Sequence, residues 1–271
     1  MRKKPIYKLE FYLVKFISFL ANKFNFQTSI KFGKLLGKLI LLLGIRRKLV
    51  FKQLIEVLGE EKAKTLLPKV YENLGINSVA FLRSKKFPNE QKIANPKEYL
   101  KIVNTMKSGK GVLVLSAHIG NWELMGRKAL DYFPATSFVN IPKNPFVANL
   151  ILEQRGTKNA EFLEAKPSNF FAALEVLKKG KVLSMIVDQH PGRKGVEVEF
   201  LGMKTLFNRT FEKLVEVSEA EVFTAFILQK DGKHFLEIEK IEGKVETVKR
   251  KTEEIILQNP EQYFWLHNRW K

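Results

Sequence analysis

The feature that most constrains the fold is an alternation of short apolar segments with helix-like segments, which begins at residue 111. The apolar runs are rich in β-forming residues, and the segments between them carry apolar residues at helical spacing. Strands that alternate with helices favour a largely parallel sheet with helices on its faces. We therefore predict an α/β fold. The expected strands are 111–117, 136–139, 161–164, 182–187 and 196–200, and the expected helices between them are 122–132, 145–154 and 168–179.

The remaining segments fit around this sheet. Residues 221–229 and 234–240 predict a hairpin that turns at Asp231-Gly232. No repeat and no linker-like stretch interrupts the sequence. We expect one structural domain, with a helical N-terminal region over 1–50 and the α/β part over 51–271. Further helices are expected at 50–105, where Pro68 marks a break, at 211–218 and at 245–258.

Residues 1–50 carry more than half of the net positive charge of the protein. The whole chain has 47 Lys and Arg against 28 Asp and Glu, a formal net charge of +19. This segment alone holds twelve basic residues and one acidic residue, Glu10, which gives it a charge of +11. Such an excess indicates an acidic partner, which could be nucleic acid, an anionic membrane surface or an acidic protein.

The basic residues of this segment are interleaved with aromatic and leucine clusters. Its longest uncharged runs, 16–22, 24–30 and 39–45, have seven residues each, whereas a membrane-spanning helix needs about 20 apolar residues. The pattern also lacks the long apolar core and the cleavage site of a secretory signal. It is typical of amphipathic helices that lie in a bilayer interface, with a short monotopic insertion as a variant. The alternative is a helical pair packed on the domain with a solvated basic face.

The absence of cysteine narrows the possible chemistry. It excludes a disulfide scaffold, thiolate zinc sites, iron–sulfur ligation and a cysteine nucleophile. The sequence also contains no complete phosphate-binding loop, no GxSxG elbow, no HExxH and no GxGxxG. The four histidines lack the spacing of metal ligands, and we expect no metal site; they are His118, His190, His234 and His267.

The motif with the most chemical content is SAHIGNWE, residues 116–123. An apolar strand runs into a polar turn that contains His118, and then into a helix for which Asn121 can serve as N-cap. Ligands of open parallel sheets bind beyond the carboxyl ends of the strands, which is where this histidine falls. Glu123 is expected to reach back to one imidazole nitrogen and to leave the other as a general base. The alternative is a histidine that only caps the strand end.

Two further segments carry candidate functional residues. Residues 187–195 end another predicted strand in a glycine-bounded basic loop. We take Asp188, Gln189 and Arg193 in this loop as substrate-binding candidates for a phosphate or carboxylate ligand. An ordinary turn with solvated cations is the alternative. Residues 259–270 are dense in aromatic side chains and by themselves predict core packing of the C-terminal segment.

Together these segments resemble the bacterial lipid A biosynthesis acyltransferase family, the late lauroyl/myristoyl acyltransferases, over the whole chain. His118 and Glu123 match the HxxxxD/E dyad of that family. The dyad is shared with glycerolipid acyltransferases in general, whereas the C-terminal run is specific to this family. The second block of the family resembles 177–180 with Asp188-Gln189 and 192–195, and its C-terminal signature resembles 260–263 with Trp265, His267 and Arg269.

The resemblance implies an α/β acyltransferase sheet with a membrane-associated N-terminal helix, at the cytoplasmic face of the bacterial inner membrane. It implies transfer of a fatty acyl chain from acyl carrier protein to a hydroxyl of a lipid A precursor, with no metal or organic cofactor. His118 would act as the base and Glu123 would orient it. Arg155, Arg193 and Arg209 would contact phosphates of the acceptor or of the carrier's pantetheine arm. Because acyl carrier protein is strongly acidic, the charge of this chain would also steer the donor.

The chain departs from the family pattern in two places. Many members carry an arginine before Asn-Pro after the second strand, where this chain has Asn140 or Ile141, with Lys143 as the nearby cation. After 200–202 the family has small and threonine residues, where this chain has LFNRT over 206–210. Both departures lie where acceptor or acyl chain would bind. Alternatives are therefore acylation of another glycolipid or of a lysophospholipid, and a non-catalytic basic protein that binds membranes or nucleic acid, although no nucleic-acid reader motif is recognised.

Overall fold

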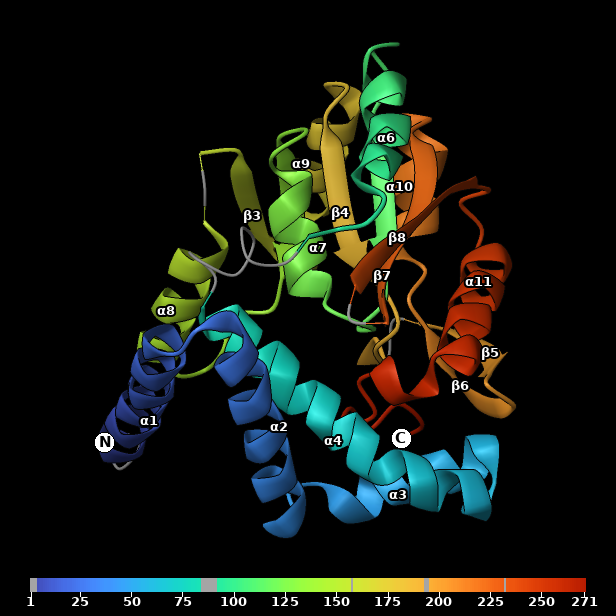
Figure 1. The fold of residues 1–271 in the computed structure, drawn as a ribbon. Helices are drawn as coiled ribbons and strands as arrows, with labels where there is room; N and C mark the ends of the chain where they lie inside the picture. The colour runs from blue at the N-terminus through green and yellow to red at the C-terminus, as the bar shows by residue number, and fades with distance from the viewer. Residues whose placement is uncertain (1–3, 84–91, 157, 193–194, 232) are drawn as a thin grey trace.

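The computed structural model describes residues 4–83, 92–156, 158–192, 195–231 and 233–271. Within these residues the centre of the fold is a six-stranded sheet (Figure 1). Five of its strands run parallel, and the sixth, at one edge, is antiparallel to its neighbour. The predicted α/β fold with a mostly parallel sheet is therefore confirmed. In order across the sheet the strands are β3 (Ala160–Glu164), β2 (Ala135–Val139), β4 (Val182–Ile186), β1 (Val112–Ser116), β7 (Glu221–Lys230) and β8 (Lys233–Ile241).

The central strand β1 is apolar because both faces of the sheet are covered. Every residue of β1 is buried. Leu113 and Leu115 belong to one hydrophobic core, and Val112 and Val114 belong to a second core on the opposite face. A parallel strand buried on both faces has such a continuous apolar run, which explains why this segment is the clearest strand in the sequence.

Helices supply the other side of each core. Side chains of α9, α10 and α11 contribute to one core, and those of α6 and α7 contribute to the other. The α-helices after the N-terminal region are α3 (Arg47–Leu58), α4 (Glu60–Leu82), α6 (Tyr99–Met106), α7 (Trp122–Ala129), α8 (Pro145–Arg155), α9 (Phe170–Lys178), α10 (Thr210–Ser218) and α11 (Val245–Gln258). Short 3₁₀ helices are η1 (Pro96–Glu98), η2 (Pro167–Asn169) and η4 (Pro260–Gln262).

Two details differ from the prediction. Pro68, a predicted break, lies inside α4, which continues through it. Leu67 and Val70 on either side are buried, and this packing outweighs the backbone hydrogen bond that proline cannot make. The predicted strand at 196–200 does not join the main sheet: β5 (Val196–Phe200) pairs with β6 (Met203–Phe207) in a separate two-stranded antiparallel sheet.

The predicted hairpin is confirmed at the edge of the main sheet. β7 and β8 pair from Val222 with Ile241 to Lys230 with Lys233. Asp231 sits in the turn with a φ of 49°, in the left-handed region that Asp tolerates in tight turns. Gly232, the other predicted turn residue, lies outside the described residues.

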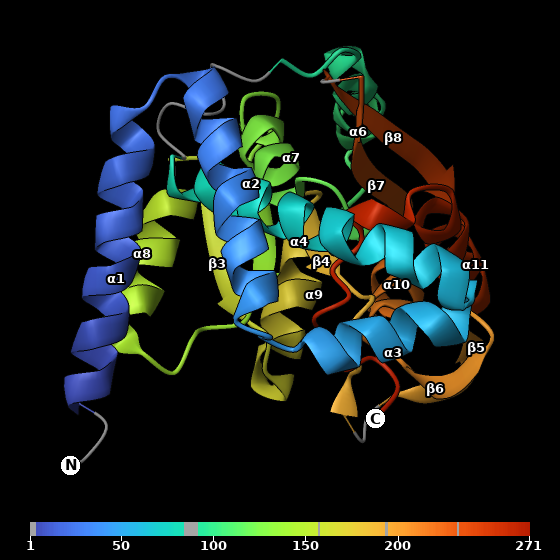
Figure 2. The same cartoon turned by 60° about the horizontal axis from the view of Figure 1, so that its bottom comes forward.

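Two helices, α1 (Lys4–Lys23) and α2 (Phe26–Leu42), form the N-terminal region. α2 packs against α4 so closely that a Cβ added at Gly37 would collide with the carbonyl oxygen of Tyr71. α1 lies along α8 at the outside of the molecule (Figure 2), and the rings of Phe11 and Phe146 meet there with centroids 5.7 Å apart. Among the described residues, no helix has the length and apolar character needed to cross a membrane.

Side chains tie both ends of α1 to the rest of the chain. Near its beginning, Asn144, the N-cap of α8, donates a hydrogen bond to the carbonyl oxygen of Tyr7 at 2.8 Å. At its end, Arg83, which follows α4, donates to the carbonyl oxygens of Ala21 and Phe24. Since the Arg83 side chain is buried, its hydrogen bonds fix the end of α1 at one place on the surface.

Candidate active site

The site is built where β1 ends and α7 begins. β1 ends at Ser116, and α7 starts at Trp122 after the predicted polar turn. Asn121 is the N-cap of α7, as predicted, because its Oδ1 accepts the backbone N–H of Leu124 at 3.1 Å. The turn places His118 at the carboxyl edge of the parallel sheet, where open α/β sheets bind their ligands.

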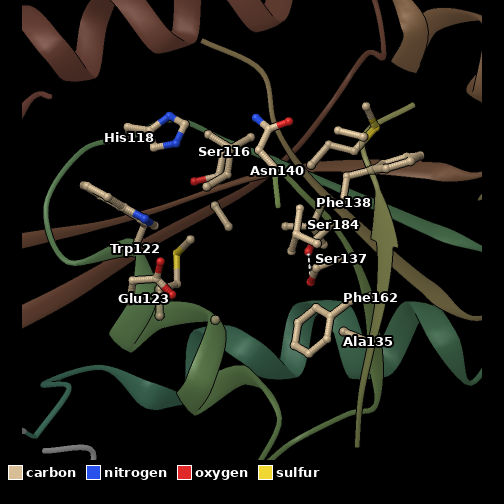
Figure 3. A pocket seen from close by; sticks show the side chains of 18 of the residues that line it. Ser116, His118, Trp122, Glu123, Ala135, Ser137, Phe138, Asn140, Phe162 and Ser184 are labelled. Carbon is tan, nitrogen blue, oxygen red and sulfur yellow. Dashed lines mark hydrogen bonds between the residues drawn. The ribbon is translucent and has the colours of Figure 1, made fainter. Parts of the chain in front are cut away.

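A cavity of about 1110 Å³ opens beside this turn. Its volume exceeds the range of about 300–1,000 Å³ that is typical of small-ligand sites. His118 and Gln189 line it near the strand ends, and Figure 3 shows Ala135 and Phe162 at the other end of the view. A cavity of this size with many apolar lining residues has room for an apolar chain beside His118. Its apolar lining includes Ile102, Val114, Phe133, Phe162 and Val182.

Asp188 holds one nitrogen of the His118 imidazole. Its Oδ1 lies 2.8 Å from His118 Nδ1 and also accepts the backbone N–H of His118 at 3.1 Å. Burial opposes the ionisation of Asp188, but the charge and hydrogen bonds of His118, together with Arg269, outweigh it and hold the pKa of Asp188 below its usual value. An ionised Asp188 accepts the Nδ1–H, so Nε2 is left unprotonated and is able to act as a base.

Nε2 of His118 faces the cavity among aromatic rings. Gln189 Nε2 lies 3.5 Å from it, and Gln189 lines the cavity. The ring of Trp122 meets the imidazole edge-on with centroids 5.2 Å apart, and that of Phe264 lies 6.0 Å away. These rings limit the access of water to the imidazole, which strengthens its interaction with Asp188.

Glu123 has a different partner from the one predicted. Arg155, the last residue of α8, donates from Nε to Glu123 Oε2 at 3.0 Å and from Nη2 to Oε1. In the part of the chain that the structure describes, Glu123 makes no hydrogen bond to His118. The predicted hydrogen bond between Glu123 and the imidazole is therefore wrong. Its physical reason is that a planar guanidinium binds a carboxylate through two parallel hydrogen bonds, and α8 brings one to Glu123.

The other predicted site residues divide into three groups. Asp188 is only 1% exposed, hydrogen-bonds the His118 imidazole and is not among the residues that line the cavity. Gln189, Arg155 and Arg209 line the cavity, as expected of substrate-binding residues. Arg193 lies outside the described residues. Among the residues that are described, no group of three or more His, Asp and Glu side chains could hold a metal ion.

The C-terminal segment does more than pack in the core, which is all that its aromatic residues predict. The backbone N–H of Phe264 donates to the His118 carbonyl oxygen at 2.9 Å, and that of Gly120 donates to the Gln262 carbonyl oxygen at 3.0 Å. The side chain of Gln262 in turn bonds both backbone groups of Gln229 in β7. The turn that carries His118 is therefore clamped between the sheet and the C-terminal segment.

Buried polar side chains of the same segment surround Asp188. Burial raises the pKa of Tyr263 well above its usual value, and the hydrogen-bonding proximity of the Asp188 carboxylate raises it further. Arg269 is buried over the rings of Phe200 and Phe207 and donates to the Leu206 carbonyl oxygen at 2.8 Å. Arg269 thus stabilises the charge of the buried Asp188, and the neutral phenol of Tyr263 lies beside that carboxylate.

The sequence was compared with known proteins. A model of a protein family described as bacterial lipid A biosynthesis acyltransferase matches residues 2–271. A search of curated proteins finds no match. The matched range includes the turn with His118 and the C-terminal clamp, so both parts of the site lie within the similarity.

Proposed function

The chain belongs to the bacterial lipid A biosynthesis acyltransferase family, and we propose that it moves a fatty acyl chain from acyl carrier protein to a hydroxyl of a lipid A precursor. The observation that carries this proposal is the His118–Asp188 pair beside a large cavity, which His118 lines together with many apolar side chains. The cavity has room for an acyl chain, and the pair supplies a base where the head of that chain would lie.

His118 acts as the general base in this mechanism. Its Nε2 takes the proton from the acceptor hydroxyl while the hydroxyl oxygen bonds to the thioester carbonyl carbon. Asp188 accepts the Nδ1–H throughout and stabilises the imidazolium that forms. The tetrahedral intermediate then collapses, the carbon–sulfur bond breaks, and the thiolate of the carrier takes the proton from His118. The products are the new ester and the free carrier thiol.

The start of α7 is the place where the oxyanion would be stabilised. The first-turn N–H groups of a helix carry partial positive charge and have no partner within the helix. The N-cap oxygen of Asn121 accepts the N–H of Leu124, while Trp122 and Glu123 at the start of the helix line the cavity. Preorganised N–H donors at such a position typically account for about 3–4 kcal/mol of transition-state stabilisation.

Arg155 and Arg209 are proposed to bind phosphates of the acceptor or of the pantetheine arm. Both line the cavity. Glu123 fixes the guanidinium of Arg155 through two hydrogen bonds, so Arg155 presents its remaining N–H groups in a defined direction. Asn140 and Asn208, from the two segments that depart from the family pattern, also line the cavity. These departures bear on which acceptor fits.

The N-terminal region is proposed to bind the cytoplasmic face of the inner membrane. Leu9 is 71% exposed on α1, and Leu42 is 79% exposed at the end of α2. Exposed apolar rows of this extent are rare on monomeric soluble proteins, and lysines flank this row as they do in interfacial helices. The exposed apolar side chains of α1, here called the α1 apolar row, are Ile6, Leu9, Tyr12, Leu13, Phe16 and Phe19.

A rival within the same chemistry is acylation of another glycolipid or of a lysophospholipid. The base and the cavity serve any of these acceptors equally well. A rival of another class is a non-catalytic basic protein that binds membranes or nucleic acid. The hydrogen-bonded His118–Asp188 pair beside a large cavity favours an enzyme over that rival.

The test is acyl transfer from a panel of acyl carrier protein thioesters of different chain length to a detergent-solubilised lipid A precursor. His118→Ala is expected to lower turnover by about 10²–10⁴-fold. Glu175→Gln, which changes an exposed carboxylate paired with Lys179 away from the cavity, is the control and should leave turnover unchanged. Near-normal turnover of folded His118→Ala would refute the base, and transfer only to other lipids would identify a different acceptor.

A further inference from the structure

Two serine side chains form a hydrogen-bonded pair on the part of the sheet that lines the cavity. Ser137 of β2 and Ser184 of β4 are paired in register, and their Oγ atoms lie 2.6 Å apart. Figure 3 shows this hydrogen bond between the His118 end of the cavity and the side chains of Ala135 and Phe162. Both serines are half-buried and line the cavity.

The neighbours of this pair in the sheet are apolar. Val114 of β1 is in register with Ser184 on one side, and Phe162 of β3 is in register with Ser137 on the other. The next positions toward the bottom of the cavity, Ala135 and Val182, are also apolar. Interior positions of a parallel sheet normally carry apolar residues, so two adjacent hydroxyls at this level need a physical reason.

The small size of serine does not by itself explain why these two positions carry hydroxyls. Alanine occupies positions 135 and 160 of the same wall and leaves even more room for a ligand. The hydroxyls are also only partly used. Each has one donor and two acceptor sites, and the Ser137–Ser184 bond uses one donor and one acceptor. Among the described residues neither Oγ has another hydrogen-bond partner, so one O–H and several lone pairs are available to the occupant of the cavity.

We propose that Ser137 and Ser184 form a subsite that hydrogen-bonds a hydroxyl carried in the middle of the fatty chain bound in this cavity. This rests on the proposed function in taking a fatty chain as the occupant. Ser184 precedes Asp188, the partner of His118, by four residues, and the ladder continues past β4, since the Val187 N–H donates to the Ser116 carbonyl oxygen at 3.0 Å. The pair therefore lies about 13 Å along the sheet from Asp188. A hydroxyl next to the thioester would lie well above the pair, whereas a mid-chain hydroxyl would lie beside it.

Binding of free fatty acids tests the subsite without any need for catalysis. The probes are tetradecanoic acid and its isomers with a hydroxyl at the β carbon or in mid-chain, measured by displacement of a fluorescent fatty acid from the whole protein. We expect the mid-chain isomer to bind about 5–10-fold more tightly than the unsubstituted acid, the value of about one neutral hydrogen bond. The β-hydroxy isomer should gain less than the mid-chain isomer.

Variants identify the residues responsible. In S137A/S184A the order should reverse, so that the unsubstituted acid binds best, because a buried hydroxyl without a partner is penalised. Ser78→Ala removes the same atom from α4, where Oγ bonds the Leu74 carbonyl oxygen outside the cavity, and should keep the wild-type order. If the double variant does not fold, the order of the isomers on the wild-type protein and on Ser184→Ala decides the question.

Three results would overturn the subsite. One is an identical order of the three acids on the wild type and on S137A/S184A, which would mean that the serines only satisfy each other. The second is tightest binding of the β-hydroxy isomer, and the third is no binding of any chain. The acyl-transfer assay tests the proposed enzyme activity independently of the binding assay. Loss of transfer with an intact preference in binding would refute the enzyme activity while leaving the subsite in place.

Discussion

Replacing Asp188 by Asn tests the charge that supports His118. Asn has nearly the same shape, and its Oδ1 can still accept the backbone N–H of His118, which Asp188 accepts at 3.1 Å. The negative charge beside Nδ1 is lost, so the imidazolium that forms during transfer has no buried counter-charge. For unit charges about 4 Å apart at an effective dielectric constant of about 20, the lost attraction is about 4 kcal/mol.

A loss of about 4 kcal/mol from the transition state corresponds to a kcat about 10³-fold lower. KM should stay within about threefold of the wild-type value, because Asp188 is buried behind the imidazole and does not line the cavity. The assay is steady-state transfer from acyl carrier protein to the lipid acceptor. Proton NMR of the imidazole supplies a second readout, since the hydrogen-bonded Nδ1–H should give a downfield resonance in the wild type and lose it in Asp188→Asn.

Glu123→Gln is the contrasting variant. It leaves the Asp188 hydrogen bond intact, so the Nδ1–H resonance should persist, and any loss of activity should come through Arg155. Glu123→Gln should add little to the loss caused by Arg155→Gln, because Glu123 acts only through Arg155. The reasoning fails if folded Asp188→Asn loses less than tenfold in kcat, or if Glu123→Gln abolishes the resonance while Asp188→Asn retains it.

Three further predictions concern the C-terminal segment that holds the His118 turn, the α1 apolar row and the dependence of stability on pH. Tyr263→Phe removes the phenol beside Asp188 and should lower kcat about tenfold in the same transfer assay, with KM unchanged. Leu9→Glu should weaken co-sedimentation with anionic vesicles at least about tenfold, whereas Val217→Glu, which changes an exposed apolar side chain on α10, should not. Burial lowers the pKa of His234 from 6.5 to about 4. The unfolded chain therefore binds a proton between these pH values that the folded protein does not. The free energy of unfolding should fall by up to about 3 kcal/mol as the pH is lowered through this range, and denaturant titrations of His234→Phe should show a smaller fall.

The fold was predictable where local pattern and burial agree. β1 and β4 are mostly apolar because they lie inside the sheet, and the helices between strands show helical spacing because one face of each is buried. β6 (Met203–Phe207) was not predictable in this way. It lies in a two-stranded sheet outside the main one, and only one of its five residues is fully buried. Its sequence therefore shows no strong alternation of apolar and polar residues.

The sequence predicted the position of His118 at the sheet edge, but not the residue that hydrogen-bonds its imidazole. Glu123 is five residues from His118 in sequence, which made it the nearest candidate. The actual partner, Asp188, is 70 residues away and depends on which strands are neighbours. Since β1 pairs with β4 and Ser116 is in register with Ile186, two more residues on each strand bring His118 opposite Asp188. Both residues follow predicted strands, but strand order is a property of the whole fold that local pattern does not contain.

The position of Arg155 explains why an acidic residue stands at position 123 although, within the described residues, it does not hydrogen-bond His118. Arg155 ends α8 and lies over the ring of Phe81 near the end of α4, at 5.8 Å from its centroid. These are the same two helices that hold α1, through Asn144 at the start of α8 and Arg83 after α4. A cation at this partly buried junction needs a fixed counter-charge, and Glu123 supplies it from the first turn of α7. The Glu123 carboxylate therefore connects the wall of the cavity to α4 and α8, the helices that hold α1 in place. The His118 imidazole is held by Asp188 instead.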